Sequence, residues 1–283
     1  TDKAEAVALL NRYEQLEKQD SCQNDFISFV NHMWPDFIEG RHHKIIAEKF
    51  NRIAEGKLKR LIVCLPPRHS KSEFASTFFP AWMMGRRGNL KIIQTTHTAE
   101  LAVRFGRRVR NIIDSDEYQH IFPDLQLQAD NKSAGRWTTN KEGESFYAGV
   151  GGAITGRGAD LLIIDDPHSE QDAMSPKAME SAYEWYTSGP RQRLQPGGII
   201  VIVMTRWSTK DLVGNVLRKQ SDEFADQWEV VEFPAIMPES EQPLWPEFWK
   251  KEELLSVKAS LPISKWNAQW MQNPTAEEGS IVK

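Results

Sequence analysis

Runs of apolar residues that resemble buried strands, separated by helix-like segments, constrain the fold of this chain more than any other feature. The runs are continuous rather than alternating apolar and polar, which indicates strands buried on both faces. Strands of this kind form mostly parallel sheets that are covered by helices. We therefore expect an α/β fold with a mostly parallel central sheet flanked by helices. Four such runs are RLIVCL (60–65), LKIIQTT (90–96), LLIIDD (161–166) and GGIIVIVMT (197–205).

Helical spacing of apolar residues predicts helices between these strands and before the first of them. The first twenty residues are expected to form an amphipathic helix without catalytic residues. A short strand, SFYAGV (145–150), precedes the glycine-rich VGGAITGRG. The other expected helices are FISFVNHMW (26–34), HHKIIAEKFNRIAEG (42–56, stopped by Gly56), KSEFASTFFPAWMM (71–84), AELAVRFGRRVRNII (99–113), AMESAYEWYT (178–187) and TKDLVGNVLRK (209–219).

The pattern changes at about residue 222. One strand, WEVVEFPAI (228–236), is followed by turns rich in Pro and Trp and by two helices, KKEELLSVKASL and ISKWNAQWMQN. We expect a core domain over residues 1–221 and a small lid or linker subdomain over residues 222–283 that packs on it.

Composition limits the class of protein. The 283 residues are 40% hydrophobic and 26% charged, as in a globular, water-soluble protein. The net charge of −4 gives no global attraction to nucleic acid, so a DNA contact needs a local basic patch. Two cysteines, Cys22 and Cys64, indicate a reducing compartment, and Cys64 is expected to be a small buried apolar residue. We find neither a membrane-spanning run nor a signal peptide. The chain begins with Thr1 rather than Met and is expected to be a processed or recombinant fragment.

The stretch LPPRHSKS (65–72) has the layout of a phosphate-binding P-loop, because it joins a buried strand to a helix. The usual pattern, G-x-x-x-x-G-K-[ST], fails at both glycines, where Leu65 and Ser70 stand. Lys71 would still reach the β- and γ-phosphates, and the Ser72 hydroxyl would reach Mg²⁺. The alternative is an ordinary turn with Lys-Ser at a helix start. The loop residues expected to contact a nucleotide are Pro67, Arg68, His69, Ser70, Lys71 and Ser72.

Paired carboxylates end the strand of LLIIDDP (161–167). In P-loop enzymes one acid at such a strand end holds Mg²⁺ and a neighbouring acid orients the attacking water. Asp165 fits the first role and Asp166 the second. The alternative is a turn that merely ends a strand. Ligands of open α/β sheets bind at the carboxyl ends of strands, so the loop and the acids together favour a nucleotide site.

A third buried strand, IIVIVMTRW (199–207), ends in Thr205. A polar residue beside the acids can sense the γ-phosphate and transmit its loss to the following segment. This arrangement belongs to motor-type P-loop ATPases, which have an additional strand between the loop strand and the acid strand.

Four segments in order, LIVCLPPRHSKS, TGRGADLLIIDDP, IVIVMTRW and QWMQNPTAEEGSI, resemble the large terminase subunit of tailed bacteriophages. The resemblance extends from about residue 26 to residue 283. It implies a P-loop NTPase of the ASCE (RecA-like) type, and a variant P-loop with a Pro-Arg entry is common in that family.

The resemblance also implies a function. The family hydrolyses ATP to drive double-stranded DNA into an empty procapsid in the host cytoplasm. It works with a small terminase subunit as a ring, commonly a pentamer, on the portal protein. A C-terminal nuclease domain with a cluster of metal-binding acids usually follows. Because no later acid cluster exists in this sequence, we expect an isolated ATPase domain without nuclease activity.

Some residues depart from the family pattern. The water-activating acid is more often Glu, so the shorter Asp166 requires a closer water or help from Glu170. No adenine-contacting Gln is evident before the loop. His43, in RHHKII (41–46), could contact the base or could be only a histidine at a helix start.

Arginine side chains are the best suited to neutralise the negative charge that develops on the leaving phosphate oxygens. Arg68 could act in cis, and Arg157, in a glycine-rich segment, could act in trans on a neighbouring subunit. A basic helix face, composed of Arg104, Arg107, Arg108 and Arg110, could meet DNA, the next subunit or the lid, or could be solvated surface.

Three other functions remain open from the residues alone. A helicase-like ATPase would need a second RecA-like lobe, for which the chain is too short. Paired acids suit attack by water better than substrate phosphorylation by a small-molecule kinase. A capsid or scaffold protein with a decayed P-loop would lack Mg²⁺-dependent hydrolysis.

Overall fold

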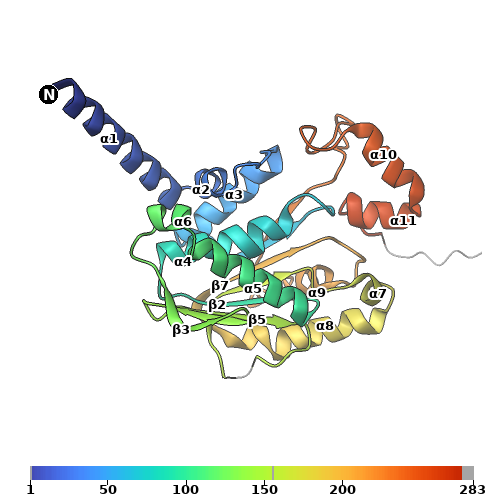
Figure 1. Cartoon of the computed structure of the whole chain (residues 1–283). Coiled ribbons are helices and arrows are strands. Elements are labelled where there is room, and N and C mark those ends of the chain that lie inside the picture. Colours follow the sequence, from blue (N-terminus) through green and yellow to red (C-terminus); the bar gives the residue numbers. More distant parts are fainter. Residues whose placement is uncertain (1, 155, 276–283) are drawn as a thin grey trace, which may run out of the picture.

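A single sheet forms the centre of the fold (Figure 1). The computed structural model describes residues 2–154 and 156–275. In this part of the chain, eight strands follow the order β3–β4–β5–β2–β6–β7–β1–β8. They are β1 (Arg60–Cys64), β2 (Lys91–Thr96), β3 (Leu127–Ser133), β4 (Arg136–Thr139), β5 (Glu144–Gly149), β6 (Ala159–Asp165), β7 (Leu194–Met204) and β8 (Glu229–Glu232).

The six strands from β5 to β8 in this order run parallel to their neighbours, whereas β4 pairs antiparallel with β5 and with β3. The prediction of a mostly parallel α/β sheet is confirmed. Strand β7 lies between β1 and β6, which is the additional strand expected between the loop strand and the acid strand.

Burial on both faces explains why the strands are continuously apolar. Alternate residues of each strand enter different cores, because successive side chains of a strand point to opposite faces. Residues such as Val63 and Ile163 pack with the helices after β1 and β2, whereas Ile62 and Ile164 pack with the two helices around β7. Cys64 is buried in the second core, as predicted.

Helices cover the two faces of the sheet (Figure 1). On one face lie α2 (Phe26–Met33), α3 (Arg41–Ala54), α4 (Phe79–Arg86) and α5 (Ala99–Ile113), and on the other lie α8 (Pro176–Ser188) and α9 (Leu212–Lys219). The helix after the P-loop begins as a π-helix, η1 (Glu73–Phe78), before it continues as α4. Two short elements, α7 (Glu170–Ala173) and η2 (Pro190–Arg193), flank α8.

The first helix, α1 (Asp2–Asn24), differs from the prediction. The helix is present, but it projects away from the rest of the molecule (Figure 1), and of its described residues Cys22 alone is buried. It is not amphipathic. Glu14 and Glu17 follow Leu10 by four and seven positions and therefore share its side of the helix. The charged residues interrupt the apolar side, so α1 has no uniform face with which to pack.

Five elements were missed by the sequence analysis: α6 (Asp116–Ile121), β3, β4 and the short α7 and η2. The two strands form an antiparallel extension beyond β5, and their sequence, LQADNKS and RWTT, contains no apolar run. Antiparallel strands need not be buried on both faces, so the pattern that identifies the central parallel strands does not apply to them.

The end of the chain contributes both to the sheet and to a separate small core. Strand β8 pairs with β1, so a boundary at residue 222 would separate it from the sheet to which it belongs. After β8, α10 (Lys251–Ser260), α11 (Ile263–Lys265) and the π-helical η3 (Trp266–Trp270) gather around their own cluster. Its buried members are Ala235, Leu254, Trp266 and Trp270. The lid subdomain therefore remains a proposal, with its start better placed after Glu232.

Thr155 and the end of QWMQNPTAEEGSI lie outside the described residues. Within those residues, no helix is long and apolar enough to cross a membrane.

Candidate nucleotide-binding site

Three predicted motifs meet at the carboxyl ends of the adjacent strands β1, β7 and β6. The Nζ of Lys71 lies 2.9 Å from Oδ2 of Asp166. The backbone N–H of Thr205 donates to Oδ1 of Asp166 at 3.0 Å, and the Thr205 hydroxyl donates to the carbonyl of Leu65 at 2.8 Å. The loop, the paired acids and the strand-end threonine thus form one site.

The loop backbone adopts the conformation for which glycine is usually needed. Ser70 has φ of 70° and Arg68 has φ of 60°, both in the left-handed region. A side chain in that region strains the backbone, and such strain concentrates at functional sites. Ser70 stands at the second glycine position of the usual P-loop pattern, so the loop keeps a glycine-like geometry with a serine.

Lys71 is charged in this site although its side chain is only 11% exposed. Burial lowers the pKa of Lys71, but the carboxylates of Asp166 and Asp165 outweigh burial and leave this pKa above its ordinary value. A fixed positive charge at the start of a helix is what a phosphate requires.

Asp165 is 1% exposed, and its Oδ2 accepts a hydrogen bond of 2.7 Å from the Ser76 hydroxyl. Burial and the neighbouring Asp166 raise the pKa of Asp165 to about 7, against the opposing effects of Lys71 and of the Ser76 and Ser72 hydroxyls. Its Oδ1 is buried without a hydrogen-bond partner among the described residues.

These residues fit a magnesium ion that is shared with a nucleotide. Mg²⁺ prefers oxygen ligands and is usually held by one or two carboxylates together with substrate phosphates. The unpartnered Oδ1 of Asp165 and the hydroxyl of Ser72 supply such oxygens. No group of three or more His, Cys, Asp or Glu in the described part of the chain could hold a metal by itself.

Asp166 is more constrained than the sequence indicates. Its φ is 40°, its N–H donates to the carbonyl of Val203, and its own carbonyl accepts from Nδ1 of His97 at 3.2 Å. His97 was missed by the sequence analysis. The available signal was its position directly after β2, which is the other parallel neighbour of β6.

His43 is a buried histidine at the start of α3, which is the simpler of the two alternatives given by the sequence. It is 0% exposed, and its Nδ1 accepts a hydrogen bond of 2.8 Å from the N–H of Gly40 at the start of α3. Its ring packs against Phe37, Phe74 and Trp245. A contact of His43 with the adenine base remains untested.

A buried histidine cluster connects α3 to the P-loop. Nε2 of His42 donates to the carbonyl of His69 at 3.1 Å, and Nδ1 of His69 donates to the carbonyl of Pro67 at 2.8 Å. Burial lowers the pKa of His42 to about 3, of His43 to about 2 and of His69 to about 4. Trp249 covers this cluster, since its ring stacks on His69 and its Nε1 donates to the carbonyl of Arg68 at 3.4 Å.

These three histidines should make stability depend on pH. They stay neutral in the folded protein and take up protons on unfolding below pH 6.5, so their stabilisation is complete above that pH and is lost as pH falls toward the folded pKa values. The raised pKa of Asp165 has the opposite effect, because it increases the free energy of unfolding as pH falls. The pH dependence should therefore be measured in an Asp165→Asn variant. Between pH 7.5 and 5.5 these three histidines together should lower the free energy of unfolding, measured in urea, by about 4 kcal/mol. His32 and His168, whose pKa values burial also lowers, should add to this fall. Adding His69→Asn should make the fall smaller by about 1.4 kcal/mol, and a free energy of unfolding that stays constant over this pH range would contradict the prediction.

The predicted arginines lie in different places. Arg68 is exposed in the loop itself. Arg157 forms an ion pair with Glu144 of β5 and lies 4.1 Å from the centroid of the Phe146 ring. Glu144 is the first residue of β5, and Arg157 comes two residues before β6. The seven residues of β6 therefore place the backbone of Arg157 more than about 20 Å from the acids, at the opposite ends of the strands. Arg157 therefore does not belong to the site of its own chain, and a role in trans remains a prediction.

The basic face of α5 and Glu170 lie outside the constellation described above. Arg104, Arg107 and Arg108 are exposed, whereas Arg110 is partly buried. Glu170 is the exposed first residue of α7. The roles predicted for the basic face and for Glu170 remain untested.

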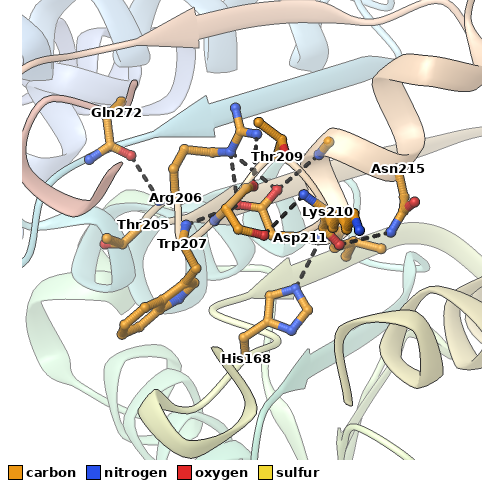
Figure 2. Close-up of polar contacts among 12 residues, drawn as sticks. His168, Thr205, Arg206, Trp207, Thr209, Lys210, Asp211, Asn215 and Gln272 are labelled. Atoms are coloured by element: carbon orange, nitrogen blue, oxygen red, sulfur yellow. Dashed lines mark hydrogen bonds and ion pairs between the residues drawn. The ribbon is translucent and has the colours of Figure 1, made fainter. Parts of the chain in front are cut away.

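A buried ion pair follows Thr205 and was also missed (Figure 2). Nε of Arg206 donates to Oδ2 of Asp211 at 3.0 Å, and Asp211 is 0% exposed. The N–H of Arg206 donates to Oε1 of Gln272 at 3.0 Å, and His168 accepts from the N–H of Leu212 at 2.9 Å (Figure 2). The segment after β7 is thereby connected both to the segment after the acids and to the C-terminal segment that carries Gln272.

Comparison with solved structures identifies the fold. A mutant ATPase domain of the large terminase of Thermus phage P74-26 aligns with a TM-score of 0.57 at 14% identity, over 87% of this chain and 98% of that domain. The large terminase of bacteriophage HK97 aligns with a TM-score of 0.57 at 10% identity, over 89% of this chain. The large terminase of a thermophilic bacteriophage in complex with ADP aligns with a TM-score of 0.50 at 11% identity, over 79% of this chain.

The chain spans 55% of the HK97 protein and 53% of the ADP-bound protein, about half the length of each. No protein-family model and no curated protein matches the sequence. At these identities the alignment bears on architecture, and it agrees with the strand order and the strand-end site described above. The chain thus has the fold of the ATPase domain of phage large terminases, a P-loop NTPase fold.

Proposed function

We propose that this chain is the ATPase domain of a viral DNA-packaging motor. The observation that carries the proposal is the constellation of Lys71, Asp166 and Thr205 at three adjacent strand ends. Phosphoryl transfer to water requires a fixed positive charge, a metal-binding acid and a water-orienting acid. Lys71 in its strained loop would supply the charge. The carboxylate pair beside the polar end of β7 would supply the two acids.

Each residue of the site would have a separate role in ATP hydrolysis. The loop and Lys71 would hold the phosphates, which requires Lys71 to turn from Asp166 toward the nucleotide. Asp165 and Ser72 would hold Mg²⁺, which neutralises charge on the phosphates when it is bound. Asp166, fixed through Oδ1 by the N–H of Thr205, would accept the proton of the attacking water at Oδ2 once Lys71 has left it. Loss of the γ-phosphate would then reach the lid subdomain through Thr205, Arg206 and Gln272.

The substrate and partners follow from the likeness to terminases. We propose that ATP hydrolysis translocates double-stranded DNA into a procapsid in the host cytoplasm. The partners would be the portal protein, a small terminase subunit and further copies of this chain in a ring. The exposed arginines of α5 supply a local basic surface that a protein of net charge −4 needs for DNA.

The proposal predicts Mg²⁺-dependent release of phosphate from ATP that rises when double-stranded DNA is added. Phosphate should be measured with ATP alone, with double-stranded DNA and with single-stranded DNA, each with Mg²⁺ and with EDTA. Stimulation by single strands alone would instead favour a helicase-like enzyme. Absence of hydrolysis in every condition, including high protein concentrations that favour a ring, would favour a structural protein.

A further inference from the structure

One buried hydroxyl beneath the P-loop has no role in the site as described so far. Ser76 is 1% exposed and lies in the π-helical turn η1. Its Oγ donates to Oδ2 of Asp165 at 2.7 Å. Ser76 follows Ser72 by four positions, so both hydroxyls lie on the side of the helix that faces the acid strand. Segments of π-helix are rare and frequently occur at functional sites.

The turn that carries Ser76 is anchored to the sheet by a hydrogen bond from strand β2. Nε2 of Gln94 donates to the carbonyl of Ser76 at 2.9 Å, and Gln94 is 3% exposed. Gln94 lies on β2 and pairs in register with Ile163 of β6, two residues before Asp165. Strands β2 and β6 therefore fix the position of Ser76 and of Asp165 from the same part of the sheet.

The two oxygens of Asp165 are consequently unequal. Oδ2 is occupied by Ser76, whereas Oδ1 is buried without a hydrogen-bond partner among the described residues. A buried carboxylate oxygen without a donor is unfavourable unless a ligand completes its bonding. Residues that orient a metal-binding carboxylate commonly contribute to metal affinity without touching the metal.

We propose that Ser76 is a positioning residue for the magnesium-binding carboxylate, with Gln94 fixing the turn that carries it. The hydroxyl holds Oδ2 of Asp165 so that Oδ1 is presented to the metal of the bound nucleotide. This inference rests on the proposed function, because it requires a nucleotide that brings a metal to Asp165.

A neighbouring residue provides a matched control. Thr77 lies in the same turn and is 5% exposed, but its hydroxyl has no hydrogen-bond partner among the described residues. Thr77→Val removes a buried hydroxyl from η1 without touching Asp165, whereas Ser76→Ala removes the hydroxyl that holds it. A general disturbance of the turn would affect both variants, and a positioning role would affect Ser76→Ala only.

The affinity for ADP, measured by calorimetry in Mg²⁺ and again in EDTA, separates metal binding from nucleotide binding. In Ser76→Ala the affinity in Mg²⁺ should fall about tenfold, the lower end of the usual effect of losing a group that orients a metal ligand. The affinity in EDTA should stay within about twofold of the wild type, because the loop and Lys71 are intact. Thr77→Val should match the wild type in both buffers.

Three results would overturn the inference: an unchanged affinity of Ser76→Ala in Mg²⁺, an equal loss in both buffers, or the same loss in Thr77→Val. If Ser76→Ala does not fold, Ser76→Cys keeps the volume and weakens the donor, and it should show a smaller loss in Mg²⁺ only. Wild-type protein that binds no ADP in either buffer would refute the proposed function as well. Wild-type binding that is tightened by Mg²⁺, with no change in Ser76→Ala, would refute this inference alone.

Discussion

Lys71→Ala should abolish ATP hydrolysis. The phosphates would lose their fixed positive charge, and Asp166 would lose the ammonium group that lies 2.9 Å from its Oδ2. Steady-state phosphate release should fall far more than tenfold, that is, by a barrier increase well above about 1.4 kcal/mol. The measurement requires circular dichroism of the same sample, because the substitution leaves two neighbouring carboxylates without their cation.

The matched control is Lys177→Ala, which removes an exposed lysine from α8 and should hydrolyse ATP at the wild-type rate. Hydrolysis by folded Lys71→Ala at more than about a tenth of the wild-type rate would show that the loop is not the catalytic site.

Asp166→Asn should stop turnover and leave ATP binding intact. Asparagine has the same size, and its Oδ1 can still accept from the N–H of Thr205, but it cannot take a proton from water. Loss of a general base costs about 10²- to 10⁴-fold in rate. Single-turnover hydrolysis and equilibrium binding of ATP, measured on the same preparation, check the two parts of the prediction.

The comparison variant is Asp165→Asn, which should weaken Mg²⁺-dependent nucleotide binding and turnover together. If both variants lose nucleotide binding to the same extent, the separate roles given to the two acids are wrong.

Much of the fold could be predicted from the sequence because its central strands are buried on both faces. Such strands are recognised by a continuous run of apolar residues, and this run is present in β1, β2, β6 and β7. The antiparallel strands β3 and β4 lack it. The amphipathic interpretation of α1 failed for a different reason. Charged and apolar residues alternate along α1, but Glu14 and Glu17 lie on the same side of the helix as Leu10.

The site could be predicted where each motif sits at the end of its own strand. Lys71, Asp166 and Thr205 were found in this way, because parallel strands bring their carboxyl ends to one edge. Partners that depend on packing were not found. Ser76 and Gln94 look like ordinary polar residues until the sheet places them against Asp165. The place of Arg157 could not be predicted either, because closeness to the acids in sequence does not reveal that a whole strand separates them; its role in trans remains a prediction.

A crystal structure with Mg²⁺ and a non-hydrolysable ATP analogue would show whether the loop and the paired acids form the nucleotide site. We expect the phosphates to lie on residues 65–72, with Lys71 turned from Asp166 to the nucleotide and Asp165 oriented toward the metal. Asp166 should keep its hydrogen bond from the N–H of Thr205, so that its other oxygen faces the γ-phosphate. A nucleotide bound elsewhere on the chain, or one bound while the ion pair of Lys71 and Asp166 remains closed, would contradict the roles proposed for these residues.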